Sequence, residues 1–306
     1  MFTKNKATPV STYTTPVSKY GADALTGLFN SYIVELSSFP DELKLADIIP
    51  IHKKGSKSDK ANYRPISLLP TISKVFERLI ANQIETFLNS RFSKHLCGFR
   101  KGYNPSYSIL NMIRKWQSCL NTSGKVGAIL MDLSKAFDCL PHDLLIAKMS
   151  AYGFGPRSLR LFLSYLSNRK HRVRIGSSIS EFLEILLGVP QGSVLGPILF
   201  NLFINDLLLL VTESDICNFA DDNTLYVCAQ NLDHVLQRLQ TDLKKIMQWF
   251  SDNGLVANPN KFQAILPGTV SQFINIKVRS LVFEGSNEVT LLGVTLDQSI
   301  ELLSSH

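Results

Sequence analysis

Two adjacent aspartates set the first requirement on the fold. In "FADDNTLY", Asp221 and Asp222 separate two apolar runs, so the segment predicts a hairpin with both carboxylates at its polar centre. Far upstream, the nearly continuous apolar run "KVGAILMDL" predicts a buried strand that ends at Asp132. Taken singly, each aspartate is explained by a turn or a cap.

The three carboxylates share one explanation if the two strands deliver them to the same point. Like charges a few ångströms apart repel, and each carboxyl would take up a proton rather than stay charged. A divalent cation removes this repulsion, and Mg²⁺ typically takes one or two carboxylates together with waters and substrate phosphates. Two such ions about 3.5–4 Å apart can stabilise both the attacking and the leaving oxygens of a phosphoryl displacement. The pattern therefore indicates metal-dependent phosphoryl transfer.

Composition limits the class of protein. The 306 residues are 45% hydrophobic and carry a net charge of +7, which indicates a globular chain of one large domain or two lobes and favours a polyanionic partner. Five cysteines without a CxxC pair, and histidines without ligand spacing, predict free thiols in a reducing compartment and no zinc site. The most apolar stretch, Ile198–Val211, is too short to span a bilayer and predicts a buried helix. We expect an intracellular protein, in the nucleus, the cytoplasm or both, with no secretory signal and no membrane partner.

Local patterns predict a mixture of helices and strands. Helical spacing of apolar residues predicts helices at 22–36, 71–88, 104–120, 141–152, 158–170 and 235–255. Extended segments are predicted on both sides of a basic loop within 46–70, in a hairpin at 171–192, and at 261–266 and 289–296. Strict βαβα alternation is missing, so the fold class expected is α+β.

Seven motifs in a fixed order carry a resemblance. They are "IPIHKKGSKSDKANYRPISLLP", "LCGFRKGYNPSYSIL", "DLSKAFD", "GVPQGSVLGPILFNLFINDL", "FADD", "NPNKF" and "LLGVTLD". Any one of them is weakly specific, but their joint order is highly specific. Over about residues 46–296 the chain is similar to the reverse transcriptases of non-long-terminal-repeat (LINE-type, jockey/CR1-like) retrotransposons.

This resemblance implies a right-hand polymerase with fingers and a palm, the palm being a small antiparallel sheet packed on helices. The implied limits are a disordered lead-in at 1–20, an N-terminal helix and fingers at 21–125, a palm at 126–296 with fingers residues interleaved around 155–190 and a primer-grip hairpin, and a tail at 297–306. The thumb is missing from this arrangement, as is an endonuclease. We therefore expect weak or distributive synthesis unless a second chain supplies the thumb or endonuclease.

The resemblance also implies a metal centre. Asp132 and Asp221 would hold two Mg²⁺ ions, or Mn²⁺ in their place, with help from the backbone carbonyl of Leu133. Asp222 would support the site, and Lys261 would donate a proton to the departing pyrophosphate. From the residues alone, Lys261 is about equally well explained as a solvated lysine at the start of a strand.

A nucleotide pocket follows from the same resemblance. Lys53 and Arg64 would grip the incoming triphosphate, although the adjacent Lys54 could replace Lys53. Phe137 would lie under the sugar and exclude a 2′-hydroxyl, whereas without the resemblance it is a core aromatic. The remaining pocket residues, Gln191 and Gly192, could by themselves be only a turn.

The function expected is RNA-directed DNA polymerase activity on an RNA template, a DNA primer and deoxynucleotides. An inactive truncated remnant that only binds nucleic acid, and a structural protein that reuses the scaffold, are the alternatives. His142 is expected to have a local structural role. Three basic clusters are expected to contact phosphates without reading bases: Lys53, Lys54, Lys57, Lys60 and Arg64; Arg100 and Lys101; Arg169, Lys170, Arg172 and Arg174.

Overall fold

The structure, a computed structural model, describes residues 22–133, 136–258, 261–268, 275–278, 281–299 and 302–305. Two compact units make up the chain. Unit 1 joins the chain up to Arg91 with Phe137–Phe203, and unit 2 joins Phe92–Ala136 with the chain from Ile204 onward. The predicted disordered lead-in at 1–20 lies outside the described residues.

Unit 2 is built on a four-stranded sheet with the strand order β7-β8-β3-β9, and every neighbouring pair is antiparallel. The buried strand and the hairpin around "ADD" predicted from the sequence are confirmed as β3, β7 and β8. Its elements are α4 (Pro105–Asn121), β3 (Lys125–Asp132), α8 (Leu207–Leu210), β7 (Asp215–Phe219), β8 (Asp222–Ala229), α9 (Leu232–Asp252), β9 (Gln263–Ile265), β10 (Asn275–Val278), β11 (Leu281–Glu284), β12 (Glu288–Leu291), β13 (Val294–Asp297) and β14 (Leu302–Ser305).

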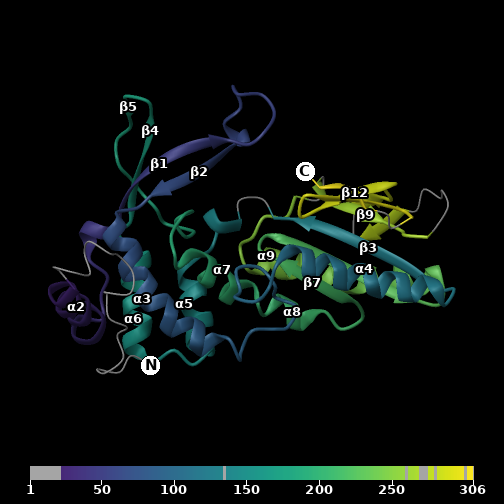
Figure 1. Cartoon of the computed structure of the whole chain (residues 1–306), viewed down its shortest axis with the longest axis horizontal. Coiled ribbons are helices and arrows are strands. Elements are labelled where there is room, and N and C mark those ends of the chain that lie inside the picture. Colours follow the sequence, from purple (N-terminus) through teal and green to yellow (C-terminus); the bar gives the residue numbers. More distant parts are fainter. Residues whose placement is uncertain are drawn as a thin grey trace. The chain divides into compact units, whose positions relative to one another are not determined.

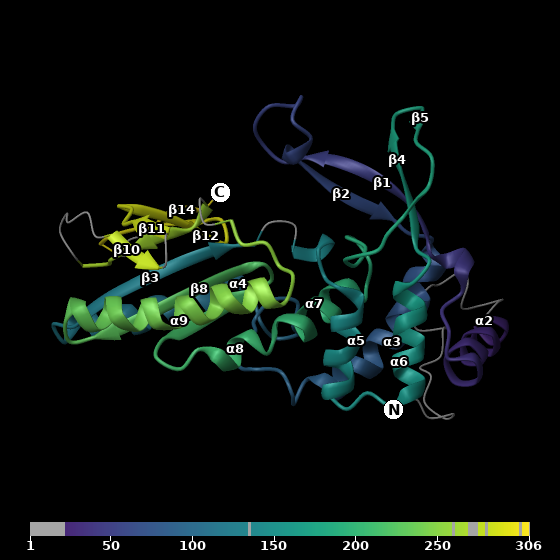
Figure 2. The ribbon, with the colours of Figure 1, turned by 180° about the vertical axis from the view of Figure 1, so that it is seen from behind.

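Helices α4 and α9 cover opposite faces of this sheet, as the two opposed views in Figures 1 and 2 show. On one face, Val126 and Ala128 of β3 join Trp116 of α4 in a buried cluster. The intervening Gly127 points the other way, where an added Cβ would lie 2.6 Å from Val235 of α9. Side chains alternate between faces along a strand, so both faces of β3 are buried, which explains its unbroken apolar sequence.

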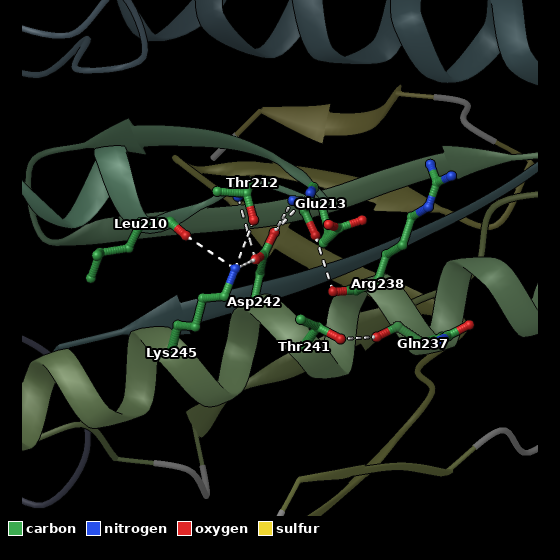
Figure 3. Close-up of polar contacts among 9 residues, drawn as sticks. Leu210, Thr212, Glu213, Gln237, Arg238, Thr241, Asp242 and Lys245 are labelled. Atoms are coloured by element: carbon green, nitrogen blue, oxygen red, sulfur yellow. Dashed lines mark hydrogen bonds and ion pairs between the residues drawn. The ribbon is translucent and has the colours of Figure 1, made fainter.

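A buried carboxylate of α9 fixes the turn that leads into β7 (Figure 3). The Asp242 side chain accepts the N–H groups of Glu213 at 2.8 Å and Ser214 at 2.7 Å, and it pairs with Lys245 at 2.9 Å. Burial by itself raises the pKa of Asp242, but the Lys245 ammonium and the backbone N–H groups outweigh it and hold the pKa below its usual range. The charged group therefore anchors the start of the strand that ends at the aspartate turn.

Unit 1 holds a second sheet, in which the strand order is β2-β1-β4-β5 and β6 also pairs with β4. Strands β1 and β2 are antiparallel, and β1 and β4 are parallel. Stacked rings of Phe29, Phe39 and Phe76 form part of its core. The elements are α2 (Ala22–Asn30) with a π-helical turn (Ser31–Leu36), β1 (Leu45–His52), β2 (Tyr63–Leu68), α3 (Thr71–Leu88), α5 (His142–Ala151), α6 (Pro156–Leu166), β4 (Lys170–Ile175), β5 (Ser178–Ile179), β6 (Leu183–Glu184) and α7 (Gly196–Ile204).

Several predicted limits differ from the structure. The apolar stretch Ile198–Val211 is broken between α7 and α8, at the buried residue Asn205, whose side-chain oxygen accepts the Ser93 N–H at 2.7 Å. The helix predicted to run to residue 170 ends at Leu166, and Asn168 has a φ of 57° before β4 begins. No helix among the described residues combines the length and the apolar character needed to cross a bilayer.

The division into units also differs from the predicted boundaries. Residues 92–125, which were predicted to belong to the fingers, lie in unit 2, where α4 packs on β3 and β8. The segment that interrupts unit 2 runs from Phe137 to Phe203, and is therefore wider than the predicted 155–190.

Candidate active site

The predicted carboxylates of unit 2 gather where two paired strands meet. Asp132 is the last residue of β3, Asp222 is the first of β8, and the two are direct partners in the antiparallel register. Asp221 immediately precedes Asp222, in the turn that follows β7. Strand register thus brings side chains 90 positions apart (222 minus 132) to one end of the sheet.

The electrostatics of this end of the sheet are unfavourable to negative charge. Asp222 is partly buried, and its pKa is raised to about 6, first by burial and then by the charges of Asp221 and Asp132. The charges of Asp221 and Asp132 therefore act on the Asp222 carboxyl. A positive charge placed between them would relieve both the repulsion and the desolvation.

A pair of buried asparagines holds the aspartate turn in shape. The Asn218 amide donates to the Ala220 carbonyl at 2.8 Å and to the Asn223 side-chain oxygen at 3.0 Å. In turn, the Asn223 amide donates to the Asp221 carbonyl at 3.2 Å. Ala220 adopts a left-handed conformation with φ of 58°, which costs free energy for a residue other than glycine and is maintained by these bonds.

The segment Leu96–Gly98 packs against this turn from the edge of the sheet. Leu96 forms a parallel bridge with Asn218, and the Cys97 N–H donates to the Asn218 carbonyl at 2.9 Å. A Cβ added to Gly98 would lie 2.2 Å from the backbone nitrogen of Ala220, closer than real Cβ contacts permit. Gly98 is thus the residue that lets the flanking segment approach the aspartate turn.

Lys261 lies beside the carboxylates. Its ammonium is 3.3 Å from the Asp132 carboxylate, and the side chains of Lys261 and Asp132 are 52% and 42% exposed. Leu133 has a buried side chain and forms an isolated antiparallel bridge with Ala257. The structure thus places Lys261 and Leu133 at the same end of the sheet as the aspartates.

The donor set fits a divalent cation. Among the described residues, no group of three or more His, Cys, Asp or Glu side chains gathers closely enough to enclose a metal ion by itself. Asp132 and Asp222 nevertheless offer carboxylate oxygens from directly opposed positions. Mg²⁺ is usually bound in this way, by one or two carboxylates, while waters and substrate phosphates complete the coordination.

In unit 1, the loop before α7 carries Gln191 and Gly192. The Gln191 side chain donates to Asp138 at 2.8 Å, and its carbonyl accepts the Ser67 N–H at 2.8 Å. Gly192 is exposed and has a φ of 103°, which disfavours any residue with a Cβ. Both predicted pocket residues therefore lie on a loop that is tied to β2 and to the residue after Phe137.

Phe137 lies at the start of the same region of unit 1. Its ring stacks on buried Phe200 with centroids 4.6 Å apart, and its own side chain is only partly buried. Its carbonyl accepts the Val189 N–H at 2.8 Å, and His142 contacts the Gly188 carbonyl at 2.7 Å. This arrangement is compatible with either predicted role of Phe137, and it gives His142 the expected local structural contact.

The predicted phosphate-binding residues differ in accessibility. Lys53, Lys54 and Arg64 are exposed on the β1–β2 arm, and within the described part of the chain none of them pairs with a carboxylate. The prediction for Arg169 is wrong, because that side chain is 1% exposed and donates to the Tyr165 carbonyl at 2.9 Å.

Three further arginines are engaged within the protein. Arg172 and Arg174 both pair with Asp47, at 2.8 and 2.7 Å, so much of their charge is neutralised. Arg100 donates to the carbonyls of Ser93 and Leu96, and it therefore shapes the loop before α4. Because these three arginines already have partners within the protein, they are less available to bind phosphates than was predicted.

Sequence reasoning missed four residues that organise the two regions: Asn218, Asn223, Asp138 and Glu77. A signal was present for two of them. Asn218 interrupts the apolar run of β7, and Glu77 stands on the apolar face of α3 together with Phe76 and Ile80. A polar residue at a buried position usually has a specific partner, which the one-dimensional pattern does not identify.

Comparisons with known proteins identify the family of this chain. The family described as "Reverse transcriptase (RNA-dependent DNA polymerase)" matches residues 51–296. Two relatives from Drosophila melanogaster are a "Probable RNA-directed DNA polymerase from transposon BS", 29% identical over 89% of this chain and 32% of that protein, and an "RNA-directed DNA polymerase from mobile element jockey", 30% identical over 89% and 31%. The "Probable RNA-directed DNA polymerase from transposon X-element" is 38% identical over 65% of this chain and 22% of that protein. The chain spans about a third or less of the length of these relatives.

Solved structures show the same fold at low identity. The "Structure of telomerase from Candida Tropicalis in complexe with TWJ fragment of telomeric RNA" has a TM-score of 0.58 at 13% identity, covering 92% of this chain and 48% of that one. The apo telomerase from the same organism, truncated from its C-terminal domain, has a TM-score of 0.56 at 15% identity, covering 92% and 60%. The fold is thus the α+β fold of reverse transcriptases, whose family generally uses divalent metal ions. With its motifs, sheet register and relatives in agreement, the chain belongs to the reverse transcriptase (RNA-dependent DNA polymerase) family, of the kind carried by non-long-terminal-repeat retrotransposons.

Proposed function

We propose that this chain performs RNA-directed DNA synthesis, adding deoxynucleotides to a primer 3′-hydroxyl by phosphoryl transfer. The observation that carries the proposal is the direct opposition of Asp132 and Asp222 beside Asp221, with the pKa of Asp222 raised to about 6. Carboxylates that are partly buried and repel one another at one end of a sheet are suited to binding cations. Phosphoryl transfer depends mainly on positioning and on neutralising charge, so this site supplies what the reaction needs.

In this proposal, Asp132 and Asp221 would hold two Mg²⁺ ions, which Mn²⁺ could replace, and the carbonyl of Leu133 would be a further ligand. When bound, the ions supply positive charge at the 3′-hydroxyl and at the departing pyrophosphate. Asp222 supports the site from the facing strand. Lys261, 3.3 Å from Asp132, donates a proton to the pyrophosphate.

The proposed nucleotide contacts come from unit 1. Exposed Lys53 and Arg64 bind the triphosphate, and the planar guanidinium of Arg64 can contact two phosphate oxygens at once. Gln191 and Gly192 line the pocket from a loop fixed by hydrogen bonds to Asp138 and Ser67. The ring of Phe137, held against Phe200, excludes a 2′-hydroxyl.

The proposed partners are an RNA template and a DNA primer, held through their backbones by the exposed lysines of the β1–β2 arm. The relatives are about three times as long as this chain or more, so a second chain or a further segment could supply the thumb and endonuclease. An intracellular location is part of the proposal. The five cysteines are free thiols, which supports a reducing compartment.

Primer extension tests the proposal. A DNA primer on a poly-RNA template, with Mg²⁺ and complementary deoxynucleotides, should be extended by the wild-type chain. The double variant Asp221→Asn/Asp222→Asn should reduce extension by at least about a hundredfold, since it removes negative charge from the cation site. A matched control, Asp252→Asn at the exposed end of α9, should extend like the wild type.

The outcomes separate the candidate functions. Extension that survives the double variant would exclude the aspartates as the cation site. Salt-dependent RNA binding without extension would instead identify a non-catalytic nucleic-acid-binding remnant. For Lys261, single-nucleotide incorporation by Lys261→Ala should be slower than by the wild type, and an equal rate would remove its role as a proton donor.

A further inference from the structure

A fully buried carboxylate lies inside unit 1, on a residue that is not part of the motifs that carry the resemblance to polymerases. Glu77 is 0% exposed, on the face of α3 that also buries Phe76 and Ile80. Burying an ionisable side chain is costly unless it is hydrogen-bonded or paired. Glu77 therefore needs partners strong enough to justify its position in the core.

Those partners are mainly two backbone amides. One Glu77 oxygen accepts the N–H of Val194 at 2.7 Å and the N–H of Leu195 at 3.1 Å, and the other oxygen accepts the Ser73 hydroxyl at 3.3 Å. Burial raises the pKa of Glu77, while the Leu195 N–H, the charge of buried Arg169, the Val194 N–H and Ser73 act in the opposite direction. The contact joins residues 117 and 118 positions apart, so it depends on the fold rather than on local sequence.

The two amides lie at the end of the loop that carries Gln191 and Gly192, immediately before α7. The Ser193 hydroxyl closes the turn by donating to the Pro190 carbonyl at 2.8 Å and accepting the Gly196 N–H at 3.0 Å. First-turn N–H groups of a helix have no partner within the helix. Glu77 satisfies two N–H groups at this helix start from the core side, where water cannot do so.

The backbone of the loop is thus fastened at two points, in addition to the Gln191 side chain that donates to Asp138. On the β2 side, the Ser67 N–H donates to Gln191, and on the core side Glu77 accepts from Val194 and Leu195. Gln191 is itself the first of these points and Gly192 follows it directly, and both residues are proposed to line the nucleotide pocket. Movement at either point would displace both of them.

We infer that Glu77 is a positioning residue for nucleotide binding: through the Val194 and Leu195 amides it fixes the loop that presents Gln191 and Gly192. This inference rests on the proposed function, because it assigns a use to the loop. Glu77 itself is buried and does not contact substrate. Its loss should consequently weaken nucleotide binding while the cation-binding carboxylates of unit 2 are left unchanged.

The variant Glu77→Gln keeps the size of the side chain but removes its negative charge. Glu85→Gln is the matched control, since Glu85 is exposed on the same helix. We expect hydrogen exchange of the Val194 and Leu195 amides to become about tenfold or more faster in Glu77→Gln. The variant replaces a charged acceptor by a neutral one, and hydrogen bonds to a neutral acceptor are weaker. We also expect the KM for deoxynucleotide to rise by about tenfold at nearly unchanged kcat, with no change in Glu85→Gln.

A milder variant guards against simple unfolding. Ser73→Ala removes one hydrogen bond to Glu77 and leaves the carboxylate in place, so it should produce the same changes at smaller size. Equal exchange at the two amides in wild type and variants, or a variant that loses kcat and keeps its KM, would overturn the inference. Wild-type protein that neither extends a primer nor shows slower exchange at Gln191 and Gly192 with deoxynucleotide would overturn the proposed function as well. An active wild type with an unaffected Glu77→Gln variant would overturn this inference alone.

Discussion

The raised pKa of Asp222 makes a prediction about stability that needs no enzymatic activity. The carboxyl has an ordinary pKa of 3.8 and a pKa of about 6 in the folded protein, so the folded state binds the proton more tightly. The contribution of this tighter proton binding to the free energy of unfolding is fully present below about pH 4. It is lost as the pH rises through about 6. Replacing Asp222 with asparagine should remove this loss.

The magnitude follows from the size of the shift. About two pKa units correspond to at most about 3 kcal/mol, since one unit is about 1.4 kcal/mol. Asp222 is only partly buried, so solvent screening reduces the expected effect to about 1–2 kcal/mol. At pH 7.5 the Asp222→Asn variant should therefore be more stable than the wild type by about 1–2 kcal/mol, and the difference should fall to about a third of this value at pH 4.5.

Tryptophan fluorescence offers a selective assay for this effect. The chain has two tryptophans, Trp116 in α4 and Trp249 in α9, and both belong to unit 2. Both are buried, so urea unfolding of unit 2 should change their emission. Unfolding curves at pH 4.5, 5.5 and 7.5 give the difference in free energy, and Glu213→Gln, which neutralises an exposed carboxylate of the same unit, should stay within about 0.5 kcal/mol of the wild type.

One result would refute the reasoning. If Asp222→Asn were equally stable or less stable than the wild type at pH 7.5, the carboxylates would not strain the folded state, and no cation would be needed between them. A second arm uses the cation directly. A ligand that binds the folded state raises its stability. Millimolar Mg²⁺ should therefore stabilise the wild type more than Asp222→Asn, which lacks one carboxylate of the proposed cation site.

Three further substitutions test other parts of the structure. Gly98→Ala should destabilise unit 2 by about 1–3 kcal/mol in the fluorescence assay and reduce primer extension, because its Cβ would meet the Ala220 nitrogen at 2.2 Å; normal activity would show that the turn can move aside. Asp242→Ala should cost about 2–4 kcal/mol of unfolding free energy, since it removes the buried carboxylate that accepts the N–H groups of Glu213 and Ser214, while exposed Asp252→Ala should change it by less than about 1 kcal/mol; similar losses would contradict the anchoring role. Phe137→Ala should narrow the preference for deoxynucleotides over ribonucleotides by about tenfold or more in kcat/KM, and an unchanged ratio would assign the ring to the core alone.

The elements that the sequence predicted well are those whose patterns are local. The apolar run ending at Asp132 and the two runs around Asp221 are β3, β7 and β8, because burial on both sides of a strand leaves a continuous apolar signature. The helix predicted at 235–255 is α9 (Leu232–Asp252), because the helical spacing of its apolar residues lies within one segment. Opposition of Asp132 and Asp222 follows once these strands pair.

What the sequence did not predict depends on partners distant in the chain. Arg169 and Arg172 have the same charge and lie three positions apart, yet the first is buried and donates to the Tyr165 carbonyl, whereas the second pairs with Asp47. Glu77 reads as one charged residue in an amphipathic helix until the amides of Val194 and Leu195 are placed beside it. Charge and periodicity describe a residue's own element, whereas burial of a polar group is decided by the surface that covers it.

The two units are interleaved in the chain, and this affects how the protein can be made. The ribosome releases β3 before the whole of Phe137–Phe203, a segment of unit 1, and only afterwards releases β8, the central partner of β3. At typical elongation speeds of about 5–20 residues per second, the 90 positions between Asp132 and Asp222 correspond to about 5–20 seconds in which an apolar strand awaits its neighbour. Chaperones should bind the nascent chain mainly during this interval. A messenger RNA with slowly translated codons between β3 and β8 should lower the yield of soluble protein.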